Sequence, residues 1–166
     1  MSHTVRRFYS STAAPTANAI ATEFLATTQA LPPQVKPQLA DINQANKLRI
    51  SLEHGYRERY MTTSATALPP GYHLVYFTPN QAGNSLGKDG SDTTFNPPKP
   101  FTRRMWAGGE IEWVERNKLR GDQTVTETTR LLSAEGKMTR AGEEMIVVGV
   151  EKKYENKNGL ALVDKR

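Results

Sequence analysis

The feature that most constrains the fold is a pair of β-rich segments near the C-terminus, joined by a polar connection. Residues 124–132 mix threonine and apolar residues with charged ones, and residues 144–154 contain the apolar run Met-Ile-Val-Val. β-Branched residues in runs of this length favour strands. Residues 133–142 between them are polar and contain glycine, a pattern typical of a hairpin connection. We therefore expect an antiparallel sheet here.

Proline and glycine divide the chain upstream of this pair. Residues 17–31 contain helix formers and end at Pro32, because proline cannot extend a helix. Residues 37–53 carry apolar residues at near-helical spacing and predict a second helix. Residues 72–77 are aromatic and β-branched and predict a strand. The expected order, helices followed by antiparallel strands, is that of an α+β domain.

Three further segments complete this outline. Residues 80–100 are rich in Gly, Asn, Asp and Pro and predict a long loop, which in a compact domain is usually functional or disordered. Residues 103–115 predict a strand that paired glycines interrupt, as at a bulge or a close approach of another backbone or ligand. Residues 155–166 predict a tail, in which residues 160–163 could add a short edge strand.

Composition narrows the class of protein. Hydrophobic residues make up 37% of the 166-residue chain, and no apolar run is long enough to span a bilayer. The net charge of +5 is compatible with nucleic acid, acidic lipid or phosphorylated carriers such as CoA, although basic proteins without such ligands are common. Cysteine is absent, which excludes disulfides, thiol nucleophiles and cysteine metal sites.

The N-terminus has the composition of a targeting segment. Residues 1–22 contain no acidic residue, carry Arg6 and Arg7, and are rich in Ser, Thr and Ala. Mitochondrial presequences are basic, hydroxyl-rich and poor in acidic residues. We expect residues 1–15 to be a presequence and the protein to reside in the mitochondrial matrix; the alternative is a disordered basic tail.

The central part of the chain resembles a known family. It contains Leu-Pro-Pro-Gly-Tyr-His-Leu-Val-Tyr-Phe at residues 68–77, Leu-Gly-Lys-Asp-Gly at residues 86–90 and Phe-Thr-Arg-Arg-Met-Trp-Ala-Gly-Gly at residues 101–109. In order and spacing these resemble the N-terminal half of MaoC-like hydratases and dehydratases, which act on acyl thioesters. The resemblance implies a hot-dog fold, an antiparallel sheet wrapped on a helix.

The resemblance also implies a division of the chain and of the chemistry. A helical extension and linker would occupy residues 16–36, the hot-dog domain residues 37–154, and the tail residues 155–166. In this family the N-terminal half helps to form the tunnel for the acyl chain and its CoA or acyl carrier protein, whereas a C-terminal half supplies the catalytic Asp or Asn and the His.

Candidate catalytic residues are few. The chain has only His3, His54 and His73, and His3 falls in the expected presequence. His73 and Asp89 are the candidates for proton transfer, which this chemistry needs. The histidine expected after the proline of a hydratase motif is absent, because Lys99 and Pro100 stand there. A histidine packed in a strand is the favoured interpretation of His73, and no resident cofactor or metal is expected.

The candidate ligand-binding residues are Arg103, Arg104, Trp106, Gly108 and Gly109. Arginine can bind the phosphates of CoA or phosphopantetheine through its planar fork. Adjacent strand residues face opposite sides, so one arginine would face a ligand and the other solvent or a carboxylate. Salt bridges to Glu110 or Glu112, a core role for the tryptophan and a simple glycine bulge are the alternatives.

Three functions remain open from the sequence. The first is the substrate-tunnel half of a (3R)-hydroxyacyl-thioester dehydratase of mitochondrial fatty-acid metabolism, lacking the catalytic half. The second is a non-catalytic hot-dog subunit that forms an oligomer or docks on a larger mitochondrial assembly, such as the ribosome, where contact with RNA would suit the basic charge. The third is a CoA- or carrier-binding module without catalysis.

Overall fold

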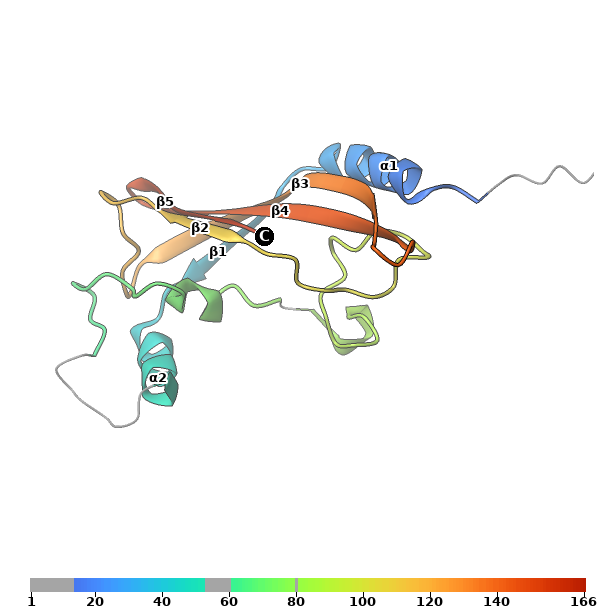
Figure 1. Ribbon diagram of the computed structural model, residues 1–166. Helices are drawn as coiled ribbons and strands as arrows, with labels where there is room; N and C mark the ends of the chain where they lie inside the picture. Colours follow the sequence, from blue (N-terminus) through green and yellow to red (C-terminus); the bar gives the residue numbers. More distant parts are fainter. Residues whose placement is uncertain (1–13, 53–60, 80) are drawn as a thin grey trace, which may run out of the picture.

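A computed structural model of the protein describes residues 14–52, 61–79 and 81–166 (Figure 1). Within these residues five antiparallel strands form one sheet in the order β1-β3-β4-β5-β2. The strands are β1 (Gln34–Leu39), β2 (Glu110–Trp113), β3 (Thr124–Met138), β4 (Glu144–Asn156) and β5 (Gly159–Lys165). The helices are α1 (Ala17–Gln29) and α2 (Ile42–Leu52), with single 3₁₀ turns at η2 (Tyr72–Val75) and η3 (Gly83–Ser85).

One face of the sheet is covered by the long connection between β1 and β2. Along β3 the residues Val125, Glu127, Thr129 and Leu131 are buried at every second position, as the two-residue period of a strand requires. Figure 1 shows α2 and η2 beneath this sheet. The core between them contains Ala40, Ala45, Tyr72, Tyr76, Leu119, Val125, Tyr154, Ala161 and Leu162. The fold is α+β, an antiparallel hot-dog sheet with N-terminal helices, as predicted.

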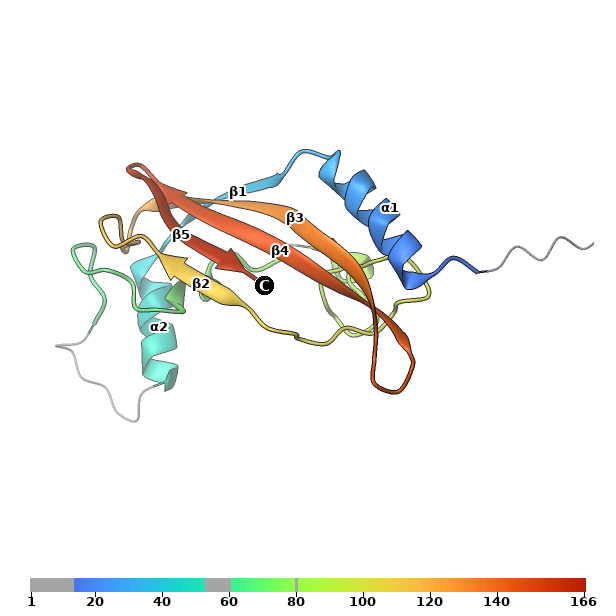
Figure 2. The same cartoon turned by 45° about the horizontal axis from the view of Figure 1, so that its top comes forward.

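Helix α1 closes an edge of the sheet. Strand β1 pairs with β3 only as far as Thr129, and α1 lies along β3 beyond that point, in line with β1 (Figure 2). The side-chain amide of Gln29 donates to the carbonyl oxygens of Leu131 and Leu132, both at 3.2 Å. A Cβ at Gly136 would lie 2.4 Å from the backbone nitrogen of Asn18, so only glycine allows this approach. Helix α1 therefore protects backbone groups that would otherwise form an open edge.

The prediction of a strand at residues 72–77 was wrong. Gly71 has a left-handed backbone with φ of 83°, and Tyr72 N–H donates to the carbonyl of Pro69, so the chain turns into η2. Local bonds of this kind satisfy the backbone without a neighbouring strand. The aromatic residues of this segment serve the core instead, since Tyr72 and Tyr76 are both buried. Apolar content was mistaken for strand character.

The helix predicted at residues 37–53 begins later, because its first residues belong to β1. Pro37 lies within β1 opposite Thr126, and an edge strand tolerates proline, which has no N–H to donate. Helix α2 then starts at Ile42, after Asp41, whose side chain accepts from the backbone N–H of Asn43. Sequence periodicity could not separate the two elements, since both carry apolar residues.

Three strand boundaries also differ from the sequence prediction. Strand β3 continues to Met138, so the hairpin connection is shorter than residues 133–142. The strand expected at residues 103–115 is confined to β2, and residues 101–109 are irregular. The stretch expected as a tail contains β5, which lies between β4 and β2 rather than at an edge. Its residues Ala161 and Leu162 are almost fully buried in the core.

Candidate functional site

The covered face of the sheet carries a buried network of charged side chains. Glu127 on β3 is only 1% exposed, and Lys152 Nζ on β4 lies 2.9 Å from its Oε2. The hydroxyl of Thr129 donates to the other oxygen of Glu127 at 3.1 Å. On β5, Asp164 pairs with Arg166, whose Nε lies 3.2 Å from Oδ1. Buried charges are stable only when paired and hydrogen-bonded in this way.

The network shifts the pKa values of its members. Burial opposes ionisation of Asp164, but interactions with His73 and Arg166 outweigh it and lower the pKa of Asp164 to about 2. Burial and the negative charge of Glu127 raise the pKa of Tyr154 well above its ordinary range. Both groups therefore keep one protonation state at neutral pH, Asp164 ionised and Tyr154 neutral. Groups held in this way stabilise a fold but are poorly suited to exchanging protons with a substrate.

His73 is a buried member of this network. The residue is 2% exposed, and its Nε2 lies 3.8 Å from Asp164 Oδ2, which is an ion-pair distance but too long for a hydrogen bond. Its ring packs edge-on against Tyr154, with the ring centroids 5.1 Å apart. His73 does not line either of the two cavities described below. Its position in η2 instead of a strand differs from the prediction, but its environment suits packing rather than catalysis.

Asp89 lies in a turn of the long loop and is exposed to solvent. Its Oδ1 accepts from the backbone N–H of Ser91 at 3.1 Å and from the Ser91 hydroxyl at 2.7 Å. These hydrogen bonds lower the pKa of Asp89, so the carboxyl is ionised at neutral pH. In the part of the chain that the structure describes, no hydrogen bond or ion pair joins Asp89 to His73. The two candidate catalytic residues are therefore not assembled into a pair.

The two adjacent arginines have different environments. Arg104 Nη1 donates to the carbonyl oxygen of Asp92 and so ties the segment before β2 to the long loop. Arg103 is exposed and has no polar partner among residues 14–52, 61–79 and 81–166. Because both lie in irregular backbone and not in a strand, the expectation that they face opposite sides of a sheet does not apply. Arg103 is the arginine that remains available to an anionic ligand.

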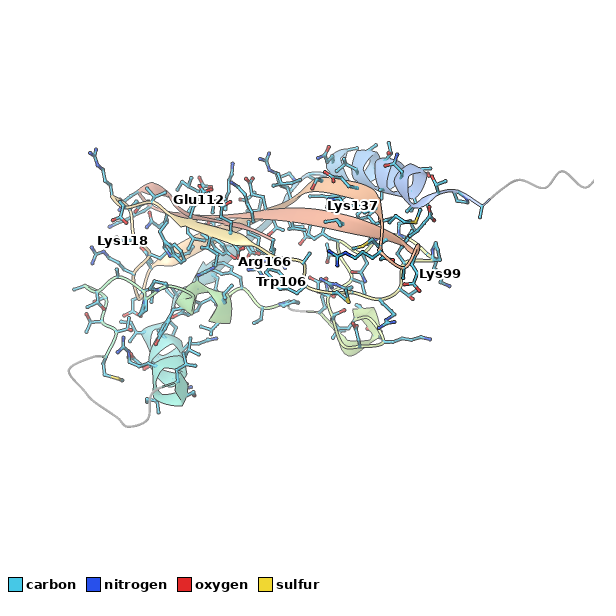
Figure 3. All side chains as sticks on the ribbon, viewed as in Figure 1. Lys99, Trp106, Glu112, Lys118, Lys137 and Arg166 are labelled. Atoms are coloured by element: carbon cyan, nitrogen blue, oxygen red, sulfur yellow. The ribbon has the colours of Figure 1, made fainter. Side chains whose placement is uncertain are left out.

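The tryptophan and the paired glycines form one local contact. Trp106 is 71% exposed, and a Cβ added to Gly109 would lie 2.9 Å from its ring and 2.9 Å from the carbonyl oxygen of Lys165. Gly108 has φ of 150°, a backbone conformation that residues with side chains rarely adopt. Figure 3 shows Trp106 beside Arg166, at the end of β5. The glycines thus let the chain approach β5 closely, which is the simple structural reading of this motif.

A groove that the sequence did not predict lies between α1, the long loop and β3. Its volume is about 570 Å³, within the range of small-molecule sites. Its wall includes Thr129, which also bonds to Glu127, so the groove borders the buried network. The lining residues are Thr28, Gln29, Leu31, Pro32, Pro33, Gln34, Thr94, Phe95, Thr129, Arg130, Leu131 and Leu132. No motif could reveal it, because the fold brings together three distant segments.

A smaller cavity of about 330 Å³ lies on the neighbouring surface of α1. It is lined by Ile20, Phe24 and Pro98 with three polar residues, Glu23, Thr27 and Asn96. Both cavities thus lie between α1 and the long loop, which supplies Phe95 to one and Pro98 to the other. This loop was expected to be functional or disordered, and the structure gives it a defined place beside α1.

The cations of the C-terminal strands are paired with acidic side chains. Lys153 Nζ lies 3.6 Å from Glu151, and Lys165 Nζ lies 3.0 Å from Glu112. Across the open face, Arg130, Glu151, Lys165 and Glu110 stand opposite one another on four strands with alternating charge. Lys152 and Arg166 are paired on the covered face. These paired cations give no support to the predicted contact with RNA.

Two absences complete the description of residues 14–52, 61–79 and 81–166. No helix there is long and apolar enough to cross a membrane. No group of three His, Cys, Asp or Glu side chains is placed to hold a metal ion in the same residues. His3, His54 and the expected presequence lie outside the described residues, apart from Ala14 and Pro15.

The five-stranded antiparallel sheet with its two helices is an α+β hot-dog domain. The sequence model of the hydroxyacyl-thioester dehydratase type 2 family matches residues 71–166, more than half of the chain. The chain therefore belongs to this family. It is also 40% identical over 53 residues to the mesaconyl-C(4)-CoA hydratase of Chloroflexus aurantiacus. That match covers 31% of this chain and 19% of the hydratase, so the chain corresponds to a small part of that protein's length.

Proposed function

We propose that this chain is the substrate-binding half of a (3R)-hydroxyacyl-thioester dehydratase or hydratase, and that the catalytic Asp and His are supplied by other residues. The observation that carries the proposal is the combination of family membership with a His73 that is buried in the core. The chain would bind the thioester and present it, while proton transfer would occur on groups outside residues 14–52, 61–79 and 81–166.

The state of His73 supports the non-catalytic part of this proposal. Dehydration of a 3-hydroxyacyl thioester needs a base within hydrogen-bond reach of the proton that it removes. His73 is the one histidine that the structure describes, and it is enclosed by Tyr154 and Asp164. A substrate could reach it only after the core around Tyr154 had opened.

The groove beside α1 and the exposed arginine support the binding part. Leu31, Phe95 and Leu131 give the groove apolar surface that suits an acyl chain. Arg103 offers a guanidinium to the phosphates of CoA or of a phosphopantetheine arm, whether free or on a carrier protein. Arg104 is already engaged with Asp92, so it serves mainly to hold the loop.

Calorimetric titration with a 3-hydroxyacyl-CoA tests the binding role. We expect saturable binding by the wild-type chain and about tenfold weaker binding by Arg103→Ala, since a hydrogen bond to a charged group contributes about 1.5–3 kcal/mol. Arg140→Ala is the matched control, because it removes the same charge from the exposed β3–β4 connection. Equal affinity of the Arg103 and Arg140 variants would remove Arg103 from the site.

The cellular setting that we propose is the mitochondrial matrix, in fatty-acid metabolism. The support is the acid-free, arginine-containing composition of residues 1–22. Sequencing the N-terminus of the mature protein tests this directly. A mature protein that begins near residue 16 is the expected result, and one that retains Met1 would contradict the presequence.

A further inference from the structure

Two of the threonine hydroxyls in the groove beside α1 donate their hydrogens to carboxylates. On β3, the hydroxyl of Thr129 donates to Glu127 Oε1 at 3.1 Å. On the long loop, the hydroxyl of Thr94 donates to Asp92 Oδ1 at 2.5 Å. A hydroxyl has one hydrogen and two lone pairs. Both threonine oxygens can therefore offer the groove an acceptor but not a donor.

Two longer polar side chains of the groove also have their donors engaged. The amide nitrogen of Gln29 donates to the carbonyl oxygens of Leu131 and Leu132, which leaves its amide oxygen as an acceptor. The Nε of Arg130 donates to Glu151 Oε1 at 2.7 Å, on the open face of the sheet. The hydrogen bonding of the groove therefore favours a ligand group that can donate.

Thr129 is held more firmly than the other acceptors of the groove. Only 4% of Thr129 is exposed, and its partner Glu127 is itself fixed by Lys152, whose Nζ lies 2.9 Å from Oε2. Glu127 and Lys152 are thus positioning residues that orient the hydroxyl of Thr129. Leu131 lies on the same face two residues further along β3, about 6.6 Å away. An acyl tail packed against Leu131 would therefore bring a hydroxyl near its head within reach of Thr129.

We propose that Thr129 Oγ1 accepts a hydrogen bond from the 3-hydroxyl of the acyl thioester, so that Thr129 distinguishes 3-hydroxyacyl thioesters from those without the hydroxyl. This inference rests on the proposed function, because it takes the groove as the acyl site. A saturated acyl chain would cover the Thr129 oxygen without giving it a donor, which costs binding free energy. A 3-hydroxyl supplies the donor, and its own burial is made favourable because it gains a partner.

Calorimetric titration with two CoA esters of equal chain length tests this role of Thr129. The esters, (3R)-3-hydroxydecanoyl-CoA and decanoyl-CoA, differ only in the hydroxyl. We expect the wild-type chain to bind the hydroxy ester about three- to tenfold more tightly, as one hydrogen bond would allow. Thr129→Val keeps the shape of the side chain and suits a strand, and it should bind the hydroxy ester no more tightly than decanoyl-CoA. Thr129→Ser retains the hydroxyl and should keep the preference.

Thr128→Val is the matched control, because Thr128 is the next residue of β3 and faces the other side of the sheet. This variant should keep the wild-type preference. The ratio of the two affinities is the decisive readout, since general damage to the fold would weaken the binding of both esters. Equal affinity of the wild type for both esters, or an unchanged preference in Thr129→Val, would overturn the role of Thr129 and leave the proposed function intact. If neither ester binds the wild-type chain, both proposals fail.

Discussion

Replacing Asp164 by asparagine should lower the free energy of unfolding by about 2 kcal/mol at neutral pH. The pKa of Asp164 falls from its ordinary value of 3.8 to about 2 in the folded protein. Each pKa unit corresponds to about 1.4 kcal/mol of preference for the charged form, so the shift contributes about 2 kcal/mol. Asparagine retains the size of the side chain but carries no charge, so the ion pair with Arg166 is lost.

The pH dependence of this loss follows from the sign of the shift. A carboxyl whose pKa is lowered by folding contributes its full stability above the unfolded pKa, near pH 4. That contribution disappears as the pH falls from about 4 to about 2, because protonation then removes the charge in both states. The difference in stability between wild type and Asp164→Asn should therefore be constant above pH 5 and shrink below pH 4.

Urea unfolding followed by tryptophan fluorescence, at a series of pH values between 2 and 7, measures this difference. The matched control is Glu115→Gln, since Glu115 is 83% exposed and its contact with Lys118 is a surface ion pair. Such pairs contribute about 1 kcal/mol or less. The reasoning is refuted if Asp164→Asn is no more destabilising than Glu115→Gln, or if its effect is the same at pH 2 and pH 7.

Three further outcomes follow from the structure. Gly136→Ala should destabilise the fold by about 1–3 kcal/mol, because the new methyl group meets the backbone of Asn18. The same variant should raise the rate of amide hydrogen exchange in α1, and an unchanged rate would show that α1 does not pack there. Because the pKa of Tyr154 is raised in the folded protein, only the unfolded state ionises above pH 10, and the free energy of unfolding should fall there. Tyr154→Phe should make this fall smaller. Identical stability profiles of variant and wild type at alkaline pH would contradict the prediction. Arg104→Ala should make the long loop more sensitive to limited proteolysis, whereas Arg103→Ala should not, because only Arg104 bonds to Asp92.

The sequence correctly predicted the elements whose residue types alone determine their secondary structure. β3 and β4 were found with nearly correct starts, because β-branched and apolar residues concentrate in both segments. Helix α1 was also predicted within two residues at its C-terminal end, since Pro32 limits it. In these cases one local rule determines the structure.

The elements that the sequence missed depend on distant contacts. Pro37 was assigned to the predicted helix, but it lies in the edge strand β1, where a residue without an N–H is tolerated. The aromatic segment of η2 resembles a strand in composition, yet the turn at Gly71 and local hydrogen bonds decide its form. β5 looked like part of a tail because its burial comes from β2 and β4, which flank it on both sides.

In the candidate site, too, the sequence predicted what local residues determine and missed what distant contacts determine. The sequence singled out Arg103, Trp106 and the paired glycines, and the structure places the Trp106 ring against Gly109 just before β2. The sequence could not distinguish Arg103 from Arg104, since the hydrogen bond of Arg104 to Asp92 depends on how the long loop folds back. The groove beside α1 left no sequence signal, because its walls come from three segments that are far apart in the sequence.

The account depends most on the separation of binding from catalysis, and one experiment measures both. The purified chain is mixed with a 2-enoyl-CoA, hydration is followed by loss of the conjugated thioester absorbance, and binding is followed by calorimetry on the same sample. We predict saturable binding with hydration no faster than in buffer, since His73 is buried in the core and only 2% exposed. Catalytic turnover by this chain alone would contradict the account, and so would a complete lack of binding.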